Sequence, residues 1–156
     1  MAQLAPGDRA PAFTATDQHG KKVKLSDLKG RNVVVYFYPK ADTAGCTAQS
    51  CALRDARQDL ATLDAAVVGI SPDAPARQLR FDEKYGLGFP LLADEDHAVA
   101  EQWGVWGEKV NYGRKYFGIV RSAFVVDAKG KIAAAFYKVS PKDTVPKVTQ
   151  ALEALG

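Results

Sequence analysis

The stretch from residue 33 to residue 51 constrains the fold of this chain most, because an apolar segment there runs into a helix that carries both cysteines. Residues 33–38 are apolar or aromatic throughout, as expected of a strand that is covered on both faces. Pro39 ends this strand, since proline has no backbone N–H and disfavours helix for the residue before it. The segment that follows favours a helix with an apolar face at helical spacing: Leu53, Ala56, Leu60 and Leu63.

Cys46 falls in the first turn of this predicted helix. Thr43 is a competent N-cap and Asp42 is a second candidate, and either choice leads to the same placement. The unpaired N–H groups at a helix N-terminus stabilise an anion and so favour the thiolate, which is the nucleophilic form of cysteine. Cys46 is therefore a candidate nucleophile. The alternative is a buried structural cysteine, because free cysteine is among the most buried residue types.

Cys51 is the second cysteine of the same helix. Residues five apart in an ideal helix have Cα atoms roughly 8.6 Å apart, whereas a disulfide needs them closer than about 7 Å. If the helix runs intact through Cys46 and Cys51, the two thiols cannot bond. Oxidation to a disulfide would then have to unwind at least the first turn, which describes a switch and not a permanent crosslink.

The remaining elements follow in an order that indicates a mixed α/β sheet. A buried strand at 66–70 completes a strand–helix–strand unit, which implies a parallel pair with a right-handed crossover. The last helix is expected to start near residue 143 or 144, because Pro146 cannot sit deep in a helix. The other predicted elements, in chain order, are a hairpin of residues 13–16 and 22–25, a helical turn at 26–30, a helix at 71–85, a short strand at 89–92, a short helix at 94–103, and antiparallel strands at 121–127 and 131–137.

Residues 104–120 form a segment rich in glycine and aromatic residues, for which we expect a long loop. Loops of this length inside a compact domain tend to be functional. The aromatic residues in and beside it line an active-site wall or form part of a satellite core, and the sequence leaves these two alternatives open: Trp103, Trp106, Tyr112, Tyr116 and Phe117.

Composition excludes several classes of function. At 156 residues, 47% hydrophobic and 25% charged, the chain fits a single globular domain over residues 1–156. Its net charge of +3 is scattered, so no nucleic-acid surface is expected, and no apolar run approaches the roughly 20 residues of a membrane span. Two histidines and two cysteines without ligand spacing predict no metal site. Two cysteines and no visible signal peptide favour a reducing compartment, with the cytoplasm as the default.

The run Pro39-x-x-x-Thr43-x-x-Cys46 resembles the active-site signature of the peroxiredoxins. Phe37-Tyr38-Pro39-Lys40 and the second cysteine five residues after the first are similar to the bacterioferritin comigratory protein (PrxQ) branch of that family. The resemblance continues at 104–109 and 121–127 and covers essentially the whole chain. It departs at Ala44, where relatives often have proline, and at Gln49, where many peroxiredoxins carry glutamate.

The resemblance implies a fold, a reaction and a role for each signature residue. The fold would be a thioredoxin-like three-layer α/β/α sandwich with a mixed central sheet and an N-terminal β-hairpin. Cys46 would attack a peroxide oxygen, while Thr43 and Arg121 would donate hydrogen bonds to the reacting oxygens and Arg121 would stabilise the thiolate. Pro39 would cover the pocket and exclude water. Cys51 would resolve the resulting sulfenic acid in an intramolecular disulfide.

The resemblance also implies the partners. The substrates would be hydrogen peroxide and organic hydroperoxides, the reductant thioredoxin or a similar dithiol, and the protein a monomer that needs no cofactor. Two alternatives stay open. One is a thiol–disulfide oxidoreductase, although such enzymes usually carry Cys-x-x-Cys, where both thiols bond without unfolding the helix. The other is a redox-sensing module that reports peroxide to a partner without turnover.

Overall fold

The central strand β3 (Asn32–Phe37) is enclosed by the sheet and by both of its covering layers. The computed structural model describes residues 3–155. In it, β3 pairs in parallel with β4 (Ala65–Ser71) on one side and antiparallel with β8 (Ser122–Val126) on the other. The predicted parallel pair around the cysteine helix is therefore confirmed.

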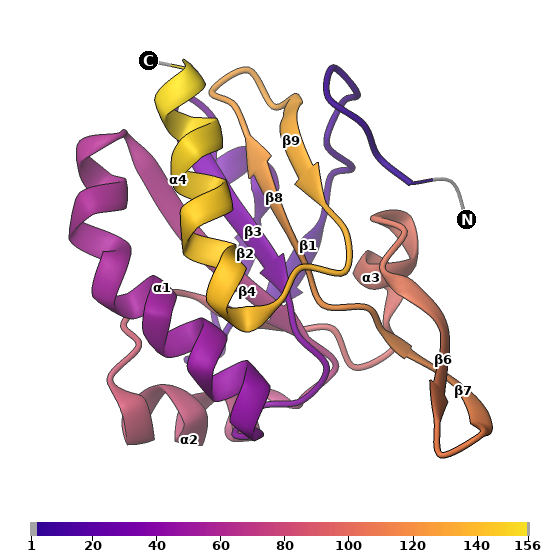
Figure 1. Ribbon diagram of the computed structural model, residues 1–156. Helices are drawn as coiled ribbons and strands as arrows, with labels where there is room; N and C mark the ends of the chain where they lie inside the picture. The colour runs from indigo at the N-terminus through magenta and orange to yellow at the C-terminus, as the bar shows by residue number, and fades with distance from the viewer. Residues whose placement is uncertain (1–2, 156) are drawn as a thin grey trace.

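Seven strands form one mixed sheet in the order β2-β1-β5-β4-β3-β8-β9 (Figure 1). The N-terminal hairpin, the parallel centre and the antiparallel C-terminal pair all lie where the sequence predicts them. The strands not yet given are β1 (Thr14–Thr16), β2 (Lys22–Lys24), β5 (Leu91–Ala93) and β9 (Ile132–Phe136). The predicted thioredoxin-like α/β architecture with its mixed sheet is thus confirmed.

The side chains of β3 alternate between two apolar layers, as the period of a strand requires. Val34 and Tyr36 point to the layer shared with α1 (Ala44–Thr62), α2 (Pro75–Tyr85) and α4 (Thr144–Leu155). Val33, Val35 and Phe37 point to the other layer, which contains α3 (Ala98–Gln102), the N-terminal segment and Trp103. In Figure 1, α1 and α4 lie side by side across one face of the sheet. Because both faces are covered, the side chains of residues 33–37 are all buried, and the one polar group among them, the Tyr36 hydroxyl, is hydrogen-bonded to Ser50.

Helix α1 begins one residue after the N-cap Thr43, as predicted. Of its predicted apolar face, Leu53 and Leu60 are fully buried, while Ala56 and Leu63 are partly buried against the same core. The helix is continuous from residue 44 to residue 62, so it contains both cysteines.

Two predicted helix boundaries were wrong. Helix α2 starts at Pro75 and not at Ser71, because β4 extends through Ser71 and proline is favoured at the first helical position. Helix α3 is shorter than residues 94–103, because His97 adopts a left-handed backbone conformation (φ 50°) immediately before it. The turn at 26–30 forms a 3₁₀ helix, η1 (Leu25–Leu28), and Gly30 follows it with φ 97°.

The prediction of a long loop at 104–120 was also wrong. Strands β6 (Trp106–Asn111) and β7 (Arg114–Ile119) pair antiparallel in a separate two-stranded sheet, which projects from the molecule at the lower right of Figure 1. Tyr112 and Gly113 connect the strands, both with positive φ, as a two-residue hairpin turn requires.

The aromatic residues of this region have separate environments. Trp103 is fully buried in the core, and Trp106 stacks on His97 with ring centroids 3.8 Å apart. Tyr112, Tyr116 and Phe117 are exposed on the hairpin. The core alternative therefore holds for Trp103, while the three hairpin residues form neither a core nor an enclosed wall.

Replacing Leu53 with alanine should lower the free energy of unfolding by about 2–5 kcal/mol, because it leaves a cavity under the cysteine helix. Leu155→Ala is the matched control, since Leu155 is also helical but 45% exposed, and it should change stability by less than about 0.5 kcal/mol. Chemical denaturation of both variants measures the difference. Equal losses would contradict the assignment of Leu53 to the core.

Candidate active site

Cys46 lies in the first turn of α1 and is fully buried. Cys51 lies farther along the same helix and is half-buried. Both are free thiols in a helix that is intact between them. The geometry is therefore the one in which the sequence predicts that the two sulfur atoms cannot bond.

Arg121, which immediately precedes β8, reaches the start of α1 with its guanidinium group. Its Nη2 donates a hydrogen bond to Cys46 Sγ at 3.4 Å, and its Nη1 donates to Gln49 Oε1 at 2.9 Å. The planar fork of arginine makes these two bonds from one rigid group. The structure thus brings Cys46 and Arg121 together, as the family resemblance implies.

Gly45 makes room for this guanidinium. A Cβ atom at Gly45 would lie 2.9 Å from Arg121 Nη2, which is closer than real Cβ atoms approach. A larger residue beside the cysteine would push the arginine away from the sulfur. This close approach is the physical reason for glycine immediately before Cys46.

Gln49 connects the arginine to the C-terminal part of the chain. Its Nε2 donates to Thr144 Oγ1 at 3.1 Å, and the Thr144 hydroxyl donates to the Ser140 carbonyl at 2.9 Å. Gln49 and Thr144 are both buried. The first two turns of α1 are therefore held by β8 through Arg121 and by the start of α4 through Thr144.

Tyr36 supports the helix from beneath. Its hydroxyl forms a 2.8 Å hydrogen bond with Ser50 Oγ, and its ring occupies the space over Gly69, where a Cβ would lie 2.9 Å from the ring. Burial raises the pKa of Tyr36 well above its ordinary value, so the phenol stays protonated. Tyr36 is thus a neutral hydrogen-bonding partner below the cysteine turn.

Thr43 and Pro39 lie in the chain segment between β3 and Cys46. Thr43 is exposed, and its hydroxyl donates to the Lys40 carbonyl at 2.8 Å instead of capping the helix. The predicted N-cap position is right, but the capping hydrogen bond is absent. The first N–H groups of a helix have no intrahelical acceptor, so these donors stay available beside Cys46. Pro39 is half-buried at the end of β3.

The turn before α1 is hydrogen-bonded to residues of α2 and of the segment just before it. The Ala41 N–H donates to Asp73 Oδ2 at 2.7 Å, inside the protein. Asp42, with φ 62°, accepts hydrogen bonds from Lys84 Nζ at 3.0 Å and from the Tyr85 hydroxyl at 2.8 Å. The hydrogen bonds of the Asp42 carboxylate with Lys84 and Tyr85 are here called the Asp42 clasp. Together with the bond from Ala41 to Asp73, they hold the turn in place independently of the helix.

Lys109 adds positive charge near the site. Its Nζ donates to the Ile119 carbonyl at 2.8 Å, across the base of the hairpin. Burial, then the charge of Arg121, lower the pKa of Lys109, and Cys46 acts in the opposite direction. The hairpin base thus contributes to the electrostatic environment of the cysteine.

Four residues of the site had no predicted role: Gln49, Gly45, Tyr36 and Thr144. Gln49 could have been found, because it lies three residues after Cys46 and so on the same helix face. The contact with Thr144 depends on packing between segments far apart in the chain and leaves no local signal. Within residues 3–155, no three histidine, cysteine, aspartate or glutamate side chains are grouped to hold a metal ion, and no helix is both long and apolar enough to cross a membrane.

A thioredoxin-like sheet with a buried cysteine in the first turn of a helix defines the class of thiol-dependent redox proteins. Within that class, residues 6–135 match the model of the AhpC/TSA family. The chain belongs to the AhpC/TSA family, and it is a peroxiredoxin, a thiol peroxidase.

Individual relatives agree with this assignment. Peroxiredoxin Bcp of Escherichia coli (strain K12) is 52% identical over 136 residues, which cover 87% of each chain. The crystal structure of the peroxidoxin BcpB from Mycobacterium tuberculosis is 33% identical, with a TM-score of 0.88 and 99% of each chain covered. A structure of the Xanthomonas campestris bacterioferritin comigratory protein, described for its alkyl peroxide reduction activity, is 29% identical with a TM-score of 0.87, covering 98% of this chain and 97% of its own.

Asp42→Asn should destabilise the protein at neutral pH, because the carboxylate is the acceptor for Lys84 and Tyr85. These hydrogen bonds, that of Lys84 first, lower the pKa of Asp42 below its ordinary 3.8. A lowered pKa contributes stability above that value and loses it as the pH falls through the folded-state pKa. The stabilities of the wild type and the variant should therefore converge in acid.

Thermal unfolding from pH 7 to below pH 3 would measure this convergence. Asparagine tolerates the positive φ of this position, so the substitution tests charge and not backbone strain. Asp59→Asn, at an exposed position of α1 with no ion pair among the described residues, is the control and should show no such convergence. A stability difference that is independent of pH would contradict the role of the Asp42 carboxylate.

Proposed function

We propose that the chain reduces hydrogen peroxide and organic hydroperoxides with Cys46 as the peroxidatic nucleophile. The observation that carries the proposal is the 3.4 Å hydrogen bond from Arg121 Nη2 to Cys46 Sγ at the start of α1. A thiolate at this position gains from the guanidinium charge and from the unpaired N–H groups of the helix. The relative described for alkyl peroxide reduction supports organic hydroperoxides as one substrate class.

In the proposed first step, the Cys46 thiolate attacks one oxygen of the peroxide. The O–O bond breaks as the S–O bond forms, and the leaving oxygen takes a proton to depart as water or an alcohol. Cysteine is oxidised to sulfenic acid while the peroxide is reduced. Arg121 donates to the oxygens as negative charge develops on them, the Thr43 hydroxyl supplies a further donor after it turns from Lys40, and Pro39 limits access of water.

In the second step, Cys51 attacks the sulfenic sulfur of Cys46. A disulfide forms and the sulfenic oxygen leaves as a second molecule of water. The first turns of α1 must unwind for this step, because the sulfur atoms cannot meet in the intact helix. Unwinding would break the contacts of Cys46 and Gln49 with Arg121, and also the bonds from Gln49 to Thr144 and from Ser50 to Tyr36.

A dithiol protein must then reduce the disulfide by thiol–disulfide exchange, which returns both cysteines to thiols. We propose thioredoxin or a similar dithiol as this partner, with the enzyme acting as a monomer in the cytoplasm. The family membership and the two free cysteines support this assignment.

Cys46→Ser should abolish peroxide consumption, because serine cannot supply a thiolate. Steady-state assays with hydrogen peroxide, cumene hydroperoxide and a thioredoxin system would measure the loss. Near-normal turnover of this variant would refute Cys46 as the nucleophile.

Cys51→Ser should still consume one equivalent of peroxide but fail to cycle with thioredoxin. Intact mass after oxidation separates the two reactions: the wild type should lose about two hydrogens, as a disulfide requires, and the variant should gain one oxygen. Undiminished cycling in the variant would show that another group resolves the sulfenic acid.

Arg121→Met should lower the second-order rate constant with hydrogen peroxide by about 10²-fold, as expected when a preorganised donor is removed from a charged transition state. Arg121→Lys keeps the charge but lacks the two-pronged geometry, so it should recover only part of the rate. Arg114→Met, which removes an exposed arginine of the hairpin, is the control and should react at the wild-type rate. Stopped-flow tryptophan fluorescence would follow all four proteins. Equal rates for Arg121→Met and the wild type would exclude Arg121 from the reaction.

A further inference from the structure

A cavity of about 280 Å³ lies at the end of the sheet remote from Cys46. Val33, near the start of β3, and Val126, at the end of β8, form part of its lining. The cysteine turn follows the opposite end of β3, roughly 17 Å farther along the strand at the usual rise per residue. The cavity is therefore separate from the active site.

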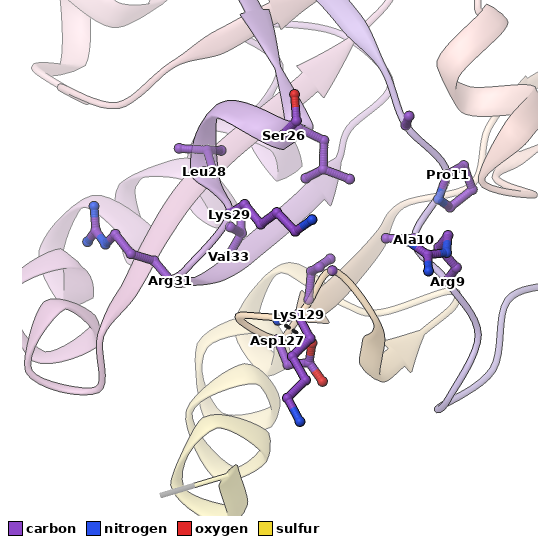
Figure 2. Close-up of a pocket in the computed structure, with 14 residues that line it drawn as sticks. Arg9, Ala10, Pro11, Ser26, Leu28, Lys29, Arg31, Val33, Asp127 and Lys129 are labelled. Carbon is purple, nitrogen blue, oxygen red and sulfur yellow. Dashed lines mark hydrogen bonds between the residues drawn. The ribbon is translucent and has the colours of Figure 1, made fainter.

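The floor and walls of the cavity are largely apolar. Leu25 and Leu28 of η1 line one side, and Pro11 of the N-terminal segment lines the opposite side. Figure 2 shows η1 and the N-terminal segment on either side of the open space, with the turn after β8 below them. The residues that the structure describes leave apolar surface uncovered at this site, and covering it with an apolar group would be favourable.

The rim of the cavity is strongly basic. Four cationic residues contribute to its lining, against the single acidic residue Asp127. That carboxylate already accepts hydrogen bonds from the N–H groups of Lys129 and Lys131, which close the turn between β8 and β9. The four cationic residues are Arg9, Lys29, Arg31 and Lys129.

Two of these cationic residues, Lys29 and Arg9, lie on opposite sides of the open space. In Figure 2, Lys29 extends from η1 toward the segment that carries Arg9 on the far side, whereas Arg31 points away from the cavity and Lys129 points downward. Arg31 is also paired with Asp64, at 3.6 Å. Within residues 3–155, the side chains of Lys29 and Arg9 make no ion pair and no hydrogen bond. Positive charge is therefore uncompensated on both sides of an apolar cavity.

We propose that this cavity binds a small amphipathic carboxylate, with its hydrocarbon part on the apolar floor and its head group between Lys29 and Arg9. A volume of about 280 Å³ lies near the lower end of the range for small-molecule sites, which favours a short ligand. A medium-chain fatty acid such as octanoate is a suitable probe of this class. The head group would gain charge-assisted hydrogen bonds from two side chains that have no such partner within residues 3–155.

Both halves of such a ligand are needed for recognition. Exposed cations alone bind a small anion weakly, because water and salt screen the interaction. An apolar cavity alone does not distinguish an acid from an alcohol. The juxtaposition of the two features specifies the chemical class, and it is independent of the peroxidase reaction.

The test is an NMR titration of the full-length protein with octanoate, 1-octanol and acetate at equal concentrations. Octanoate should shift the amide resonances of Leu28, Val33 and Gly130 with a saturable curve, while acetate and 1-octanol should shift them at least about tenfold less. Equal shifts from 1-octanol would show that the rim does not recognise charge. Equal shifts from acetate, or no saturable shift from octanoate, would also overturn the proposal.

Substitutions at the rim distinguish the contributions of Lys29 and Arg9 to octanoate affinity from that of the neighbouring Arg31. Lys29→Gln and Arg9→Gln should each weaken octanoate binding by about tenfold, as expected for loss of one charge-assisted hydrogen bond. Arg31→Gln removes the same charge from a side chain that points away, and it should change the affinity by less than about twofold. Equal effects of all three substitutions would mean that only net charge matters and would refute the specific site. All three positions are exposed, and unchanged thermal midpoints would confirm that the variants are folded.

Discussion

The guanidinium of Arg121 connects the parts of the structure on which the reaction depends. One rigid group hydrogen-bonds the sulfur of Cys46 and the amide of Gln49. Both hydrogen bonds therefore depend on the helical geometry of the first two turns of α1. Gln49 extends this connection to Thr144 at the start of α4. The sheet, the cysteine helix and the C-terminal helix are therefore linked through Arg121 and Gln49, and the folded helix satisfies both partners of the guanidinium.

The neutral amide of Gln49 has an electrostatic consequence. A carboxylate at this position would form an ion pair with Arg121 and compete with a thiolate for its charge. Glutamine accepts the same hydrogen bond and also donates one to Thr144. The positive charge of Arg121 thus stays available to the sulfur, while the guanidinium is held in place by a hydrogen bond to an uncharged amide.

Local patterns predicted much of the fold and the position of the nucleophile. The apolar run of β3, its end at Pro39 and the N-cap position of Thr43 are determined by neighbours in sequence, so they placed Cys46 in the first turn correctly. The hairpin of β6 and β7 was missed because both its strands are largely exposed and so lack the apolar alternation of a half-buried strand. The contact between Gln49 and Thr144 joins segments distant in the chain, and only tertiary packing determines it. The pairing of Arg121 with Cys46 came from the family resemblance and not from any local pattern.

The Asp42 clasp would limit how far the cysteine can travel in the proposed cycle. In the proposed cycle, the unwound segment would be a short tether, fixed upstream by Lys84 and Tyr85 and downstream by Leu53 in the core. A short tether confines one thiol to a small volume around the other, which corresponds to an effective concentration in the millimolar range. Encounter of the two sulfurs would then be fast compared with the opening of the helix. The lifetime of the sulfenic acid would be governed by the stability of two helical turns and not by the search for its partner.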